Sequence, residues 1–228
     1  MNAPRVERAG EEALRLRLDG GIDPGTHARV VALAQRLEAD RPPWLLDVVP
    51  AYAELALRVD VERLAADRPG EDALARAEDW LRARLASPDD DRAPATAARR
   101  IEIPVTYGGD AGPDLDALAA ELGMPAEEIV RRHAGADYRV AMLGFAPGFP
   151  YLLGLDPALA APRLATPRTR VPAGSVGIGG AQTGIYPRAA AGGWRLIGRT
   201  DLVLFDPQRA APSLLRPGDR VRFVPVRA

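Results

Sequence analysis

The side chains best suited to chemistry in this chain are arginines in a segment rich in glycine and proline, residues 138–200. Arg168 and Arg199 lie in such motifs and each precedes a threonine, with Arg163 and Arg170 nearby. A guanidinium group matches planar carboxylates and phosphates through two parallel hydrogen bonds. We therefore predict that Arg163, Arg168 and Arg199 bind an anionic substrate, although runs of charge are also common on solvated surfaces.

Polar and aromatic side chains of the same segment add candidate contacts. The Gln182 amide can donate and accept a hydrogen bond at once, and Tyr186 offers a hydroxyl on a loop. Trp194 follows two glycines and could form one wall of a small-molecule pocket. The alternatives are that Gln182 and Tyr186 brace turns through hydrogen bonds and that Trp194 is a core residue.

Acid–base and metal chemistry have few candidates in this chain. His133 is the histidine close to the segment, so by residue type it is the candidate general base, unless it caps a helix end. The chain has no cysteine and no lysine, which excludes disulfides, thiolate zinc sites and Schiff-base chemistry. Asp110 and Asp114 have the oxygen ligands that magnesium prefers, but Asp114 stands at a helix N-cap position. We therefore predict no metal site.

Charge is distributed unevenly along the chain. Residues 140–228 contain 11 Arg, 4 Asp and no Glu, a net charge of +7, whereas residues 1–139 carry a net charge of −8. A positive segment attracts anions. The arginines are not interleaved with exposed aromatics and the overall pI is about 6.2, so we predict no nucleic-acid partner. No apolar run approaches the ~20 residues of a membrane span and no signal peptide is evident, so we expect a cytoplasmic protein without a membrane partner.

The first part of the chain alternates between strand and helix patterns. The expected order is β-α-β-β-α, from a strand at 13–18, a helix from Pro24, strands at 44–49 and 52–59, and an amphipathic helix at 70–86. This order is typical of an α+β module of the split βαβ kind. Residues 87–100 combine Ser, Pro and an acidic triplet without periodicity, so we predict a linker and two domains, 1–95 and 96–228.

The second part of the chain must hold the candidate site residues in place. A strand at 101–107 precedes two short helices, the first capped by Asp114 and the second with Pro125 at its first position. From Tyr138 onward, short strands alternate with Gly/Pro turns, which is typical of a barrel or sandwich. The loop PAGSVGIGGAQTG (172–184) could present its N–H groups to an anion, or it could simply form tight barrel turns.

Four segments resemble one protein family. They are IEIPVTYGGDAGPDLDALA (101–119), YRVAMLGFAPGFPYLLGL (138–155), PRLATPRTRVPAGSVGIGGAQTGIYP (162–187) and GGWRLIGRT (192–200). These motifs closely resemble the family of 5-oxoprolinase B subunits, also described as Kip-type kinase inhibitor or allophanate hydrolase subunit 1. The resemblance implies an α+β N-terminal domain followed by a cyclophilin-like β-barrel domain.

The same resemblance implies a function. It indicates one component of an ATP-dependent 5-oxoprolinase, a hydrolase that opens the lactam of 5-oxo-L-proline to L-glutamate and is inactive without its partners. The implied partners are a C subunit, paralogous to a carboxyltransferase domain, and a separate A subunit. ATP with Mg²⁺ would act in the complex, and no organic cofactor is expected on this chain. In that setting Arg168 and Arg199 would bind the substrate carboxylate or a phosphate, and Gln182 would suit a lactam.

Two alternatives stay open from the sequence. One branch of the family binds and inhibits a sensor histidine kinase, and a cyclophilin-like barrel could offer it an apolar groove lined by Phe145, Phe149 and Tyr151. Related modules also occur in urea carboxylases, which implies a role in urea or allophanate metabolism.

Overall fold

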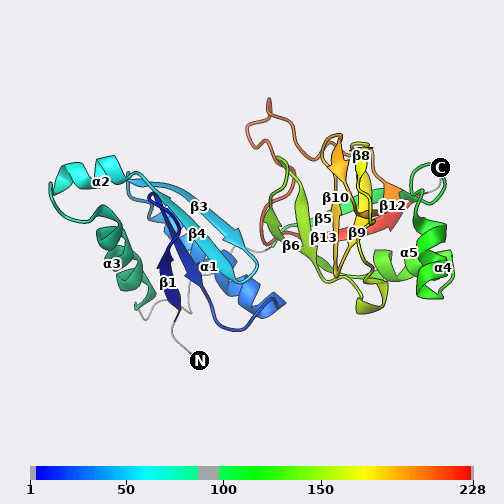
Figure 1. The fold of residues 1–228 in the computed structure, drawn as a ribbon, viewed down its shortest axis with the longest axis horizontal. Helices are drawn as coiled ribbons and strands as arrows, with labels where there is room; N and C mark the ends of the chain where they lie inside the picture. The colour runs from blue at the N-terminus through cyan, green and yellow to red at the C-terminus, as the bar shows by residue number, and fades with distance from the viewer. Residues whose placement is uncertain (1–3, 87–97, 227–228) are drawn as a thin grey trace. The chain divides into compact units, whose positions relative to one another are not determined.

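The computed structural model describes residues 4–86 and 98–226, and the chain divides into two compact units, Met1–Ala97 and Ala98–Ala228 (Figure 1). Each unit has its own cluster of buried apolar side chains. The domain boundary predicted near residue 95, and most of the linker predicted at 87–100, lie outside the described residues.

The first unit is built on a four-stranded antiparallel sheet. Its strands are β1 (Arg5–Arg8), β2 (Ala13–Arg17), β3 (Leu45–Ala51) and β4 (Glu54–Val59), in the spatial order β1-β2-β4-β3. Because β4 is antiparallel to both β2 and β3, those two strands run parallel, and α1 (Pro24–Ala39) connects them. This is the split βαβ arrangement that the sequence predicts.

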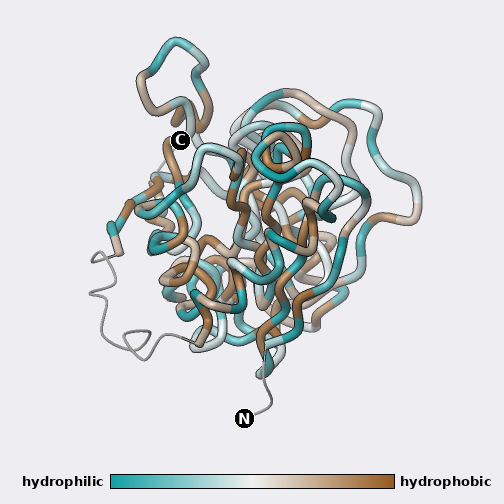
Figure 2. Tube along the Cα trace, turned by 90° about the vertical axis from the view of Figure 1, so that its left-hand side faces the viewer, coloured by the Kyte–Doolittle hydropathy of each residue, from teal (hydrophilic) through white to brown (hydrophobic). Residues whose placement is uncertain are grey.

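Amphipathic patterns explain how this unit forms its core. In β2, Leu14 and Leu16 are buried while the arginines between and after them are exposed, and Figure 2 shows such brown and teal residues alternating along the trace. Asp23 begins α1, because its side chain accepts hydrogen bonds from the N–H groups of Gly25 and Thr26. Two further helices, α2 (Val61–Asp67) and α3 (Ala73–Leu85), follow β4 in this unit.

Three details of the first unit differ from the sequence prediction. Strand β1 was not predicted, because RVER contains a single apolar residue, Val6. Helix α2 was not predicted, because seven residues are too few to show a helical period. The strand predicted at 52–59 begins at Glu54, because Tyr52 and Ala53 form the hairpin turn and Tyr52 has a φ of +53°.

The second unit is a closed barrel of seven strands, which confirms the predicted barrel. Around the barrel the strand order is β10-β7-β6-β13-β5-β12-β9, and β5 and β13 form its parallel pair. The strands are β5 (Arg100–Tyr107), β6 (Tyr138–Leu143), β7 (Pro150–Leu153), β9 (Ser175–Gly179), β10 (Gln182–Ile185), β12 (Arg195–Arg199) and β13 (Arg220–Pro225). A separate two-stranded ribbon pairs β8 (Arg168–Val171) with β11 (Ala190–Gly192).

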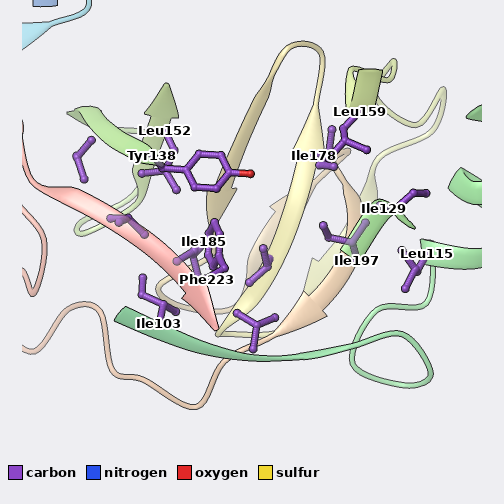
Figure 3. Close-up of a cluster of buried hydrophobic side chains, with 14 of the residues drawn as sticks. Ile103, Leu115, Ile129, Tyr138, Leu152, Leu159, Ile178, Ile185, Ile197 and Phe223 are labelled. Atoms are coloured by element: carbon purple, nitrogen blue, oxygen red, sulfur yellow. The ribbon is translucent and has the colours of Figure 1, made fainter. Parts of the chain in front are cut away.

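Side chains from strands and helices fill this barrel and cover it. Figure 3 shows Ile103, Tyr138 and Phe223 among the buried side chains, together with Leu115 and Ile129 from the helices. Those helices are α4 (Leu115–Leu122) and α5 (Ala126–Gly135), and a short 3-10 helix, η2 (Pro157–Leu159), follows β7. Within residues 4–86 and 98–226, no helix is both long enough and apolar enough to cross a bilayer.

The glycine-rich segment 172–184 forms a β-hairpin of this barrel. Strands β9 and β10 are joined by Gly180 and Ala181, and Gly180 has a φ of +65°. The N–H of Gly174 donates to the Tyr186 carbonyl at 2.7 Å, and the N–H of Gly180 donates to the Ala161 carbonyl at 2.7 Å. These two amides therefore donate hydrogen bonds within the barrel, as expected if the loop forms tight barrel turns.

Candidate functional site

A pocket of about 240 Å³ lies on the second unit and is lined mainly by aromatic rings. Three residues predicted from the sequence, Arg163, Tyr186 and Trp194, line it together. The remaining lining comes from Phe145, Phe149, Tyr151, Pro167, Ala191, Gly192 and Gly193. Small-molecule sites are typically concave and mostly apolar, with a few polar groups that orient the ligand. This pocket has that character.

Phe149 lies at the centre of the aromatic lining. Its ring centroid is 5.3 Å from that of Tyr186, 5.5 Å from that of Trp194 and 5.0 Å from that of Tyr151. Two of these contacts are edge-to-face, an arrangement that the ring quadrupoles favour. The lining is therefore a rigid, packed wall rather than a set of independent side chains.

Phe145 is the exposed part of the same lining. Its side chain is 61% exposed, although its ring centroid lies 5.4 Å from that of Phe149. Phe145 also has a φ of +64°, which is uncommon for a residue with a side chain and costs free energy. The loop therefore presents an apolar ring to solvent at the edge of the pocket.

Glycines around the pocket give the rings room to pack. A Cβ atom on Gly179 would lie 2.6 Å from the Trp194 ring, and a Cβ atom on Gly192 would lie 2.2 Å from the Tyr186 hydroxyl. Such distances are far below van der Waals contact, so only glycine fits at these positions. The glycine-rich motifs therefore shape this pocket through packing.

Arg163 and Tyr186 provide polar groups to the pocket lining, in addition to the Tyr151 hydroxyl. The Arg163 guanidinium carbon lies 5.9 Å from the centroid of the Trp194 ring, a cation–π distance. Burial raises the pKa of the Tyr186 hydroxyl, while the backbone N–H of Trp194 and the charges of Arg163 and Arg168 act in the opposite direction. Tyr186 therefore keeps its proton at neutral pH and can donate a hydrogen bond.

Arg168 is paired with a carboxylate next to the pocket. Its Nη2 donates to Asp114 Oδ1 at 2.6 Å, and the other oxygen of Asp114 accepts from the Leu196 N–H at 2.7 Å. The predicted helix cap is wrong, because the Asp114 side chain makes no capping hydrogen bond to α4. Both Asp114 oxygens therefore accept a hydrogen bond from neighbouring segments. Within the described ranges, no group of three or more His, Cys, Asp or Glu side chains could hold a metal ion.

The structure places three other residues singled out from the sequence outside the pocket lining. Arg199 is exposed at the far end of β12, roughly 16 Å along the strand from Trp194. Gln182 is half-buried at the start of β10, where it pairs with Gly179 in the β-hairpin. Arg170 is exposed on β8.

His133 lies in the barrel core and has no exposed surface. Thr183 donates its hydroxyl to the Gly177 carbonyl at 2.9 Å, so it accepts from His133 Nε2 at 2.9 Å, and the other ring nitrogen accepts from the Tyr107 hydroxyl at 2.8 Å. The ring also stacks on Phe223 at a centroid distance of 4.5 Å. Burial lowers the pKa of His133 to about 3. This geometry gives the ring a packing role and presents neither nitrogen to a substrate.

Comparisons with known proteins place the chain in a family. Residues 4–215 match the family described as carboxyltransferase domain, subdomain C and D. The B subunit of 5-oxoprolinase from Escherichia coli O157:H7 is 45% identical over 226 residues, which cover 99% of this chain and 97% of that protein. The chain belongs to the family of 5-oxoprolinase B subunits. A second member, from Bacillus subtilis, is 39% identical and is covered over 92% of its length.

The chain also resembles several solved structures. The structure of TTHA0988 has a TM-score of 0.78 and 41% identity over 95% of this chain, but the chain spans only 40% of that protein. The PH0987 protein of Pyrococcus horikoshii is 38% identical, with a TM-score of 0.56 and 98% coverage of both chains. The urea amidolyase of K. lactis, at 20% identity and a TM-score of 0.71, shares the fold.

Proposed function

We propose that this chain is the B subunit of an ATP-dependent 5-oxoprolinase, which opens 5-oxo-L-proline to L-glutamate. The observation that carries the proposal is the 45% identity to the B subunit of a 5-oxoprolinase over almost the whole length of both chains. In this proposal the chain acts in a complex with a carboxyltransferase-like C subunit and a separate A subunit, and it is inactive alone.

The aromatic pocket is the proposed substrate site within this chain. 5-Oxoproline is a small, flat lactam that carries one carboxylate, so it needs an apolar surface for the ring and a cation for the charge. Phe149 and Trp194 supply the surface, and Arg163 supplies the cation. Tyr186 would donate its hydroxyl proton to the lactam carbonyl, which accepts in the hydrogen bond.

ATP, with Mg²⁺, is proposed to bind at the level of the complex. Phosphoryl transfer to the lactam oxygen depends mainly on positioning and on stabilising negative charge. Arg199 is exposed and lies away from the aromatic pocket, so we assign it to a phosphate rather than to the substrate carboxylate. Gln182 stays a candidate for a lactam contact made only when the complex assembles.

The experiment is a measurement of 5-oxoproline-dependent ADP release by this chain purified together with its own A and C subunits. Arg163→Gln removes the carboxylate partner and should raise the KM for 5-oxoproline about tenfold, whereas Arg199→Gln should raise the KM for ATP instead. Arg222→Gln is the matched control, because Arg222 is exposed on β13. It should leave both KM values unchanged.

The possible outcomes test two claims separately: that the chain is a subunit of a 5-oxoprolinase, and that its aromatic pocket binds the substrate. Absence of ADP release from the wild-type three-subunit mixture would refute the 5-oxoprolinase proposal. Normal activity and normal KM values in Arg163→Gln would leave the chain as part of the enzyme but would exclude the aromatic pocket as the substrate site.

Binding to a sensor histidine kinase is the second candidate function. The observation that favours it is Phe145, an apolar side chain that is 61% exposed next to Phe149 and Tyr151. Protein contacts commonly centre on exposed aromatic residues that enter a partner's surface. The wild-type chain, added to the cognate sensor kinase, should slow its autophosphorylation. The Phe145→Ala variant should not slow it. If the wild-type chain does not slow the kinase, this second function is excluded.

A further inference from the structure

The buried carboxylate of Asp114, at the start of α4, contacts two segments next to the aromatic pocket. Asp114 is 7% exposed, and its two oxygens accept from Arg168 Nη2 at 2.6 Å and from the Leu196 N–H at 2.7 Å. The backbone N–H of Asp114 also donates to the Leu196 carbonyl at 2.9 Å. Hydrogen bonds to an ionised group are the strong ones in proteins, so this side chain has a defined position.

The two partners of Asp114 come from the two sides of the pocket. Arg168 directly follows Pro167, which lines the pocket, and it pairs with Gly192 across the β8–β11 ribbon. Leu196 lies in β12, two residues after Trp194, which lines the pocket. Asp114 therefore joins the β8 side of the pocket to its β12 side through a single carboxylate.

The same carboxylate compensates the charge of Arg168. Arg168 Nη1 is buried and has no hydrogen-bond partner within the part of the chain that the structure describes. The guanidinium still acts on the pocket, because its charge lowers the pKa of the Tyr186 hydroxyl against the effect of burial. Removing the carboxylate would leave a poorly compensated cation, which would have to turn toward solvent or toward the pocket.

We propose that Asp114 is a positioning residue. By binding Arg168 and the Leu196 N–H at once, it fixes the position of β8 relative to β12 and so sets the shape and charge of the aromatic pocket. The inference rests on the proposed function of the pocket as a substrate site. Helix capping does not explain the residue, because its side chain makes no hydrogen bond to the first turn of α4. Both of its side-chain hydrogen bonds instead go to Arg168 and Leu196, next to residues that line the pocket.

A double-mutant cycle tests the proposal in the three-subunit enzyme. Asp114→Asn keeps the size of the side chain but removes the charge, so the KM for 5-oxoproline should rise about tenfold while kcat falls less. Arg168→Gln should have a similar effect, and the double variant should be no worse than either single variant. Asp116→Asn is the control, since Asp116 is an exposed acid in the first turn of α4, and it should behave as wild type. Unchanged KM in Asp114→Asn, or additive effects in the double variant, would overturn the proposal.

Fluorine NMR separates this proposal from the proposed function. The chain has three tryptophans, so labelling with fluorotryptophan gives one signal for Trp194 and two for Trp44 and Trp80 in the first unit. Asp114→Asn and Arg168→Gln should both shift the Trp194 signal and leave the other two in place, and Asp116→Asn should shift none. This readout needs no substrate, so it holds even if 5-oxoproline is not turned over. An unmoved Trp194 signal in Asp114→Asn would refute the positioning role.

Discussion

Single residues show most clearly where the sequence is informative and where it is not. Residue type identified Arg163, Tyr186 and Trp194, and the structure brings these three into one pocket. The sequence left open whether Trp194 is core or pocket wall, and it is both, because it is 5% exposed and still lines the cavity. The partner of Arg168 was not predictable, because Asp114 lies 54 residues earlier in the chain.

His133 shows how burial overrides residue type. Helix position and chemistry suggested a general base or a helix cap, but the ring lies in the barrel core between Tyr107 and Thr183. The sequence contains no direct signal for this, because the three residues come together only when the barrel closes. Desolvation then disfavours the charged imidazolium.

The pKa of His133 predicts an acid-sensitive barrel. Its pKa is about 3 in the folded chain and 6.5 for an unperturbed histidine, so below pH 6.5 the unfolded chain gains a proton that the folded chain does not. Stability should therefore be full above pH 6.5 and should fall toward pH 3, by up to about 1.4 kcal/mol per pH unit. Urea unfolding, followed through the fluorine signal of Trp194, should show a flatter pH dependence for His133→Gln. Equal slopes for the two proteins would contradict the assignment.

At the scale of elements, local signals predicted the first strand and the helices α4 and α5 of the second unit, and after Tyr138 they predicted short strands without individual bounds. Proline at 125 and acids in the first turn marked α5, and alternation marked β5. Elements with few apolar residues, such as β1 and α2, gave no such signal. The sequence did not show which strands pair. It also did not show that Gly177 and Gly179 of β9 pack against Trp194, a residue that follows them in the chain by 15 residues or more.

The hairpin of β9 and β10 leads to a prediction about its glycines. Gly179→Ala would place a methyl group 2.6 Å from the Trp194 ring, so it should destabilise the second unit by about 1–3 kcal/mol and disturb the pocket. Gly135→Ala is the control, because a Cβ atom there meets nothing within 4 Å. The control should be neutral or stabilising by up to about 1 kcal/mol, since alanine favours the helix. Urea unfolding of both variants measures the difference, and equal stability would contradict the packing argument.

At the scale of the whole molecule, net charge is better counted for each compact unit than for stretches of the sequence. The +7 of residues 140–228 starts inside strand β6, whereas the compact unit of residues 98–228 contains 16 Arg and 12 acids, a net charge of +4. Acids from α4 and the turn before it, such as Asp114 and Glu121, pair with Arg168 and Arg195 of the later strands. A charge count along the chain could not anticipate this compensation.

Another ion pair links the beginning of the second unit to its last strands. Arg99 donates from Nε and Nη2 to the two carboxylate oxygens of Asp219, which is 5% exposed and also accepts from the Arg216 N–H at 2.8 Å. Arg99→Ala should lower the stability of the second unit by about 1–3 kcal/mol and leave the first unit unchanged. Arg100→Ala is the neighbouring control, because Arg100 is exposed and its ion pair with Asp137 is 3.9 Å long. Calorimetry of both variants tests this, and equal melting curves would contradict the role of the pair.

The parallel pairing of β5 with β13 has a consequence for how the chain folds during synthesis. Every residue of β13 from Arg220 to Pro225 pairs with β5, so the barrel gains its closing strand only after residue 225 has left the ribosome. Within residues 4–86, the last helix of the first unit ends at Leu85. Pairings between segments so distant in the chain also form slowly, because a long loop must close first. The first unit should therefore fold during translation, whereas β5 can pair with β12 earlier but gains its second neighbour only when β13 has been synthesised.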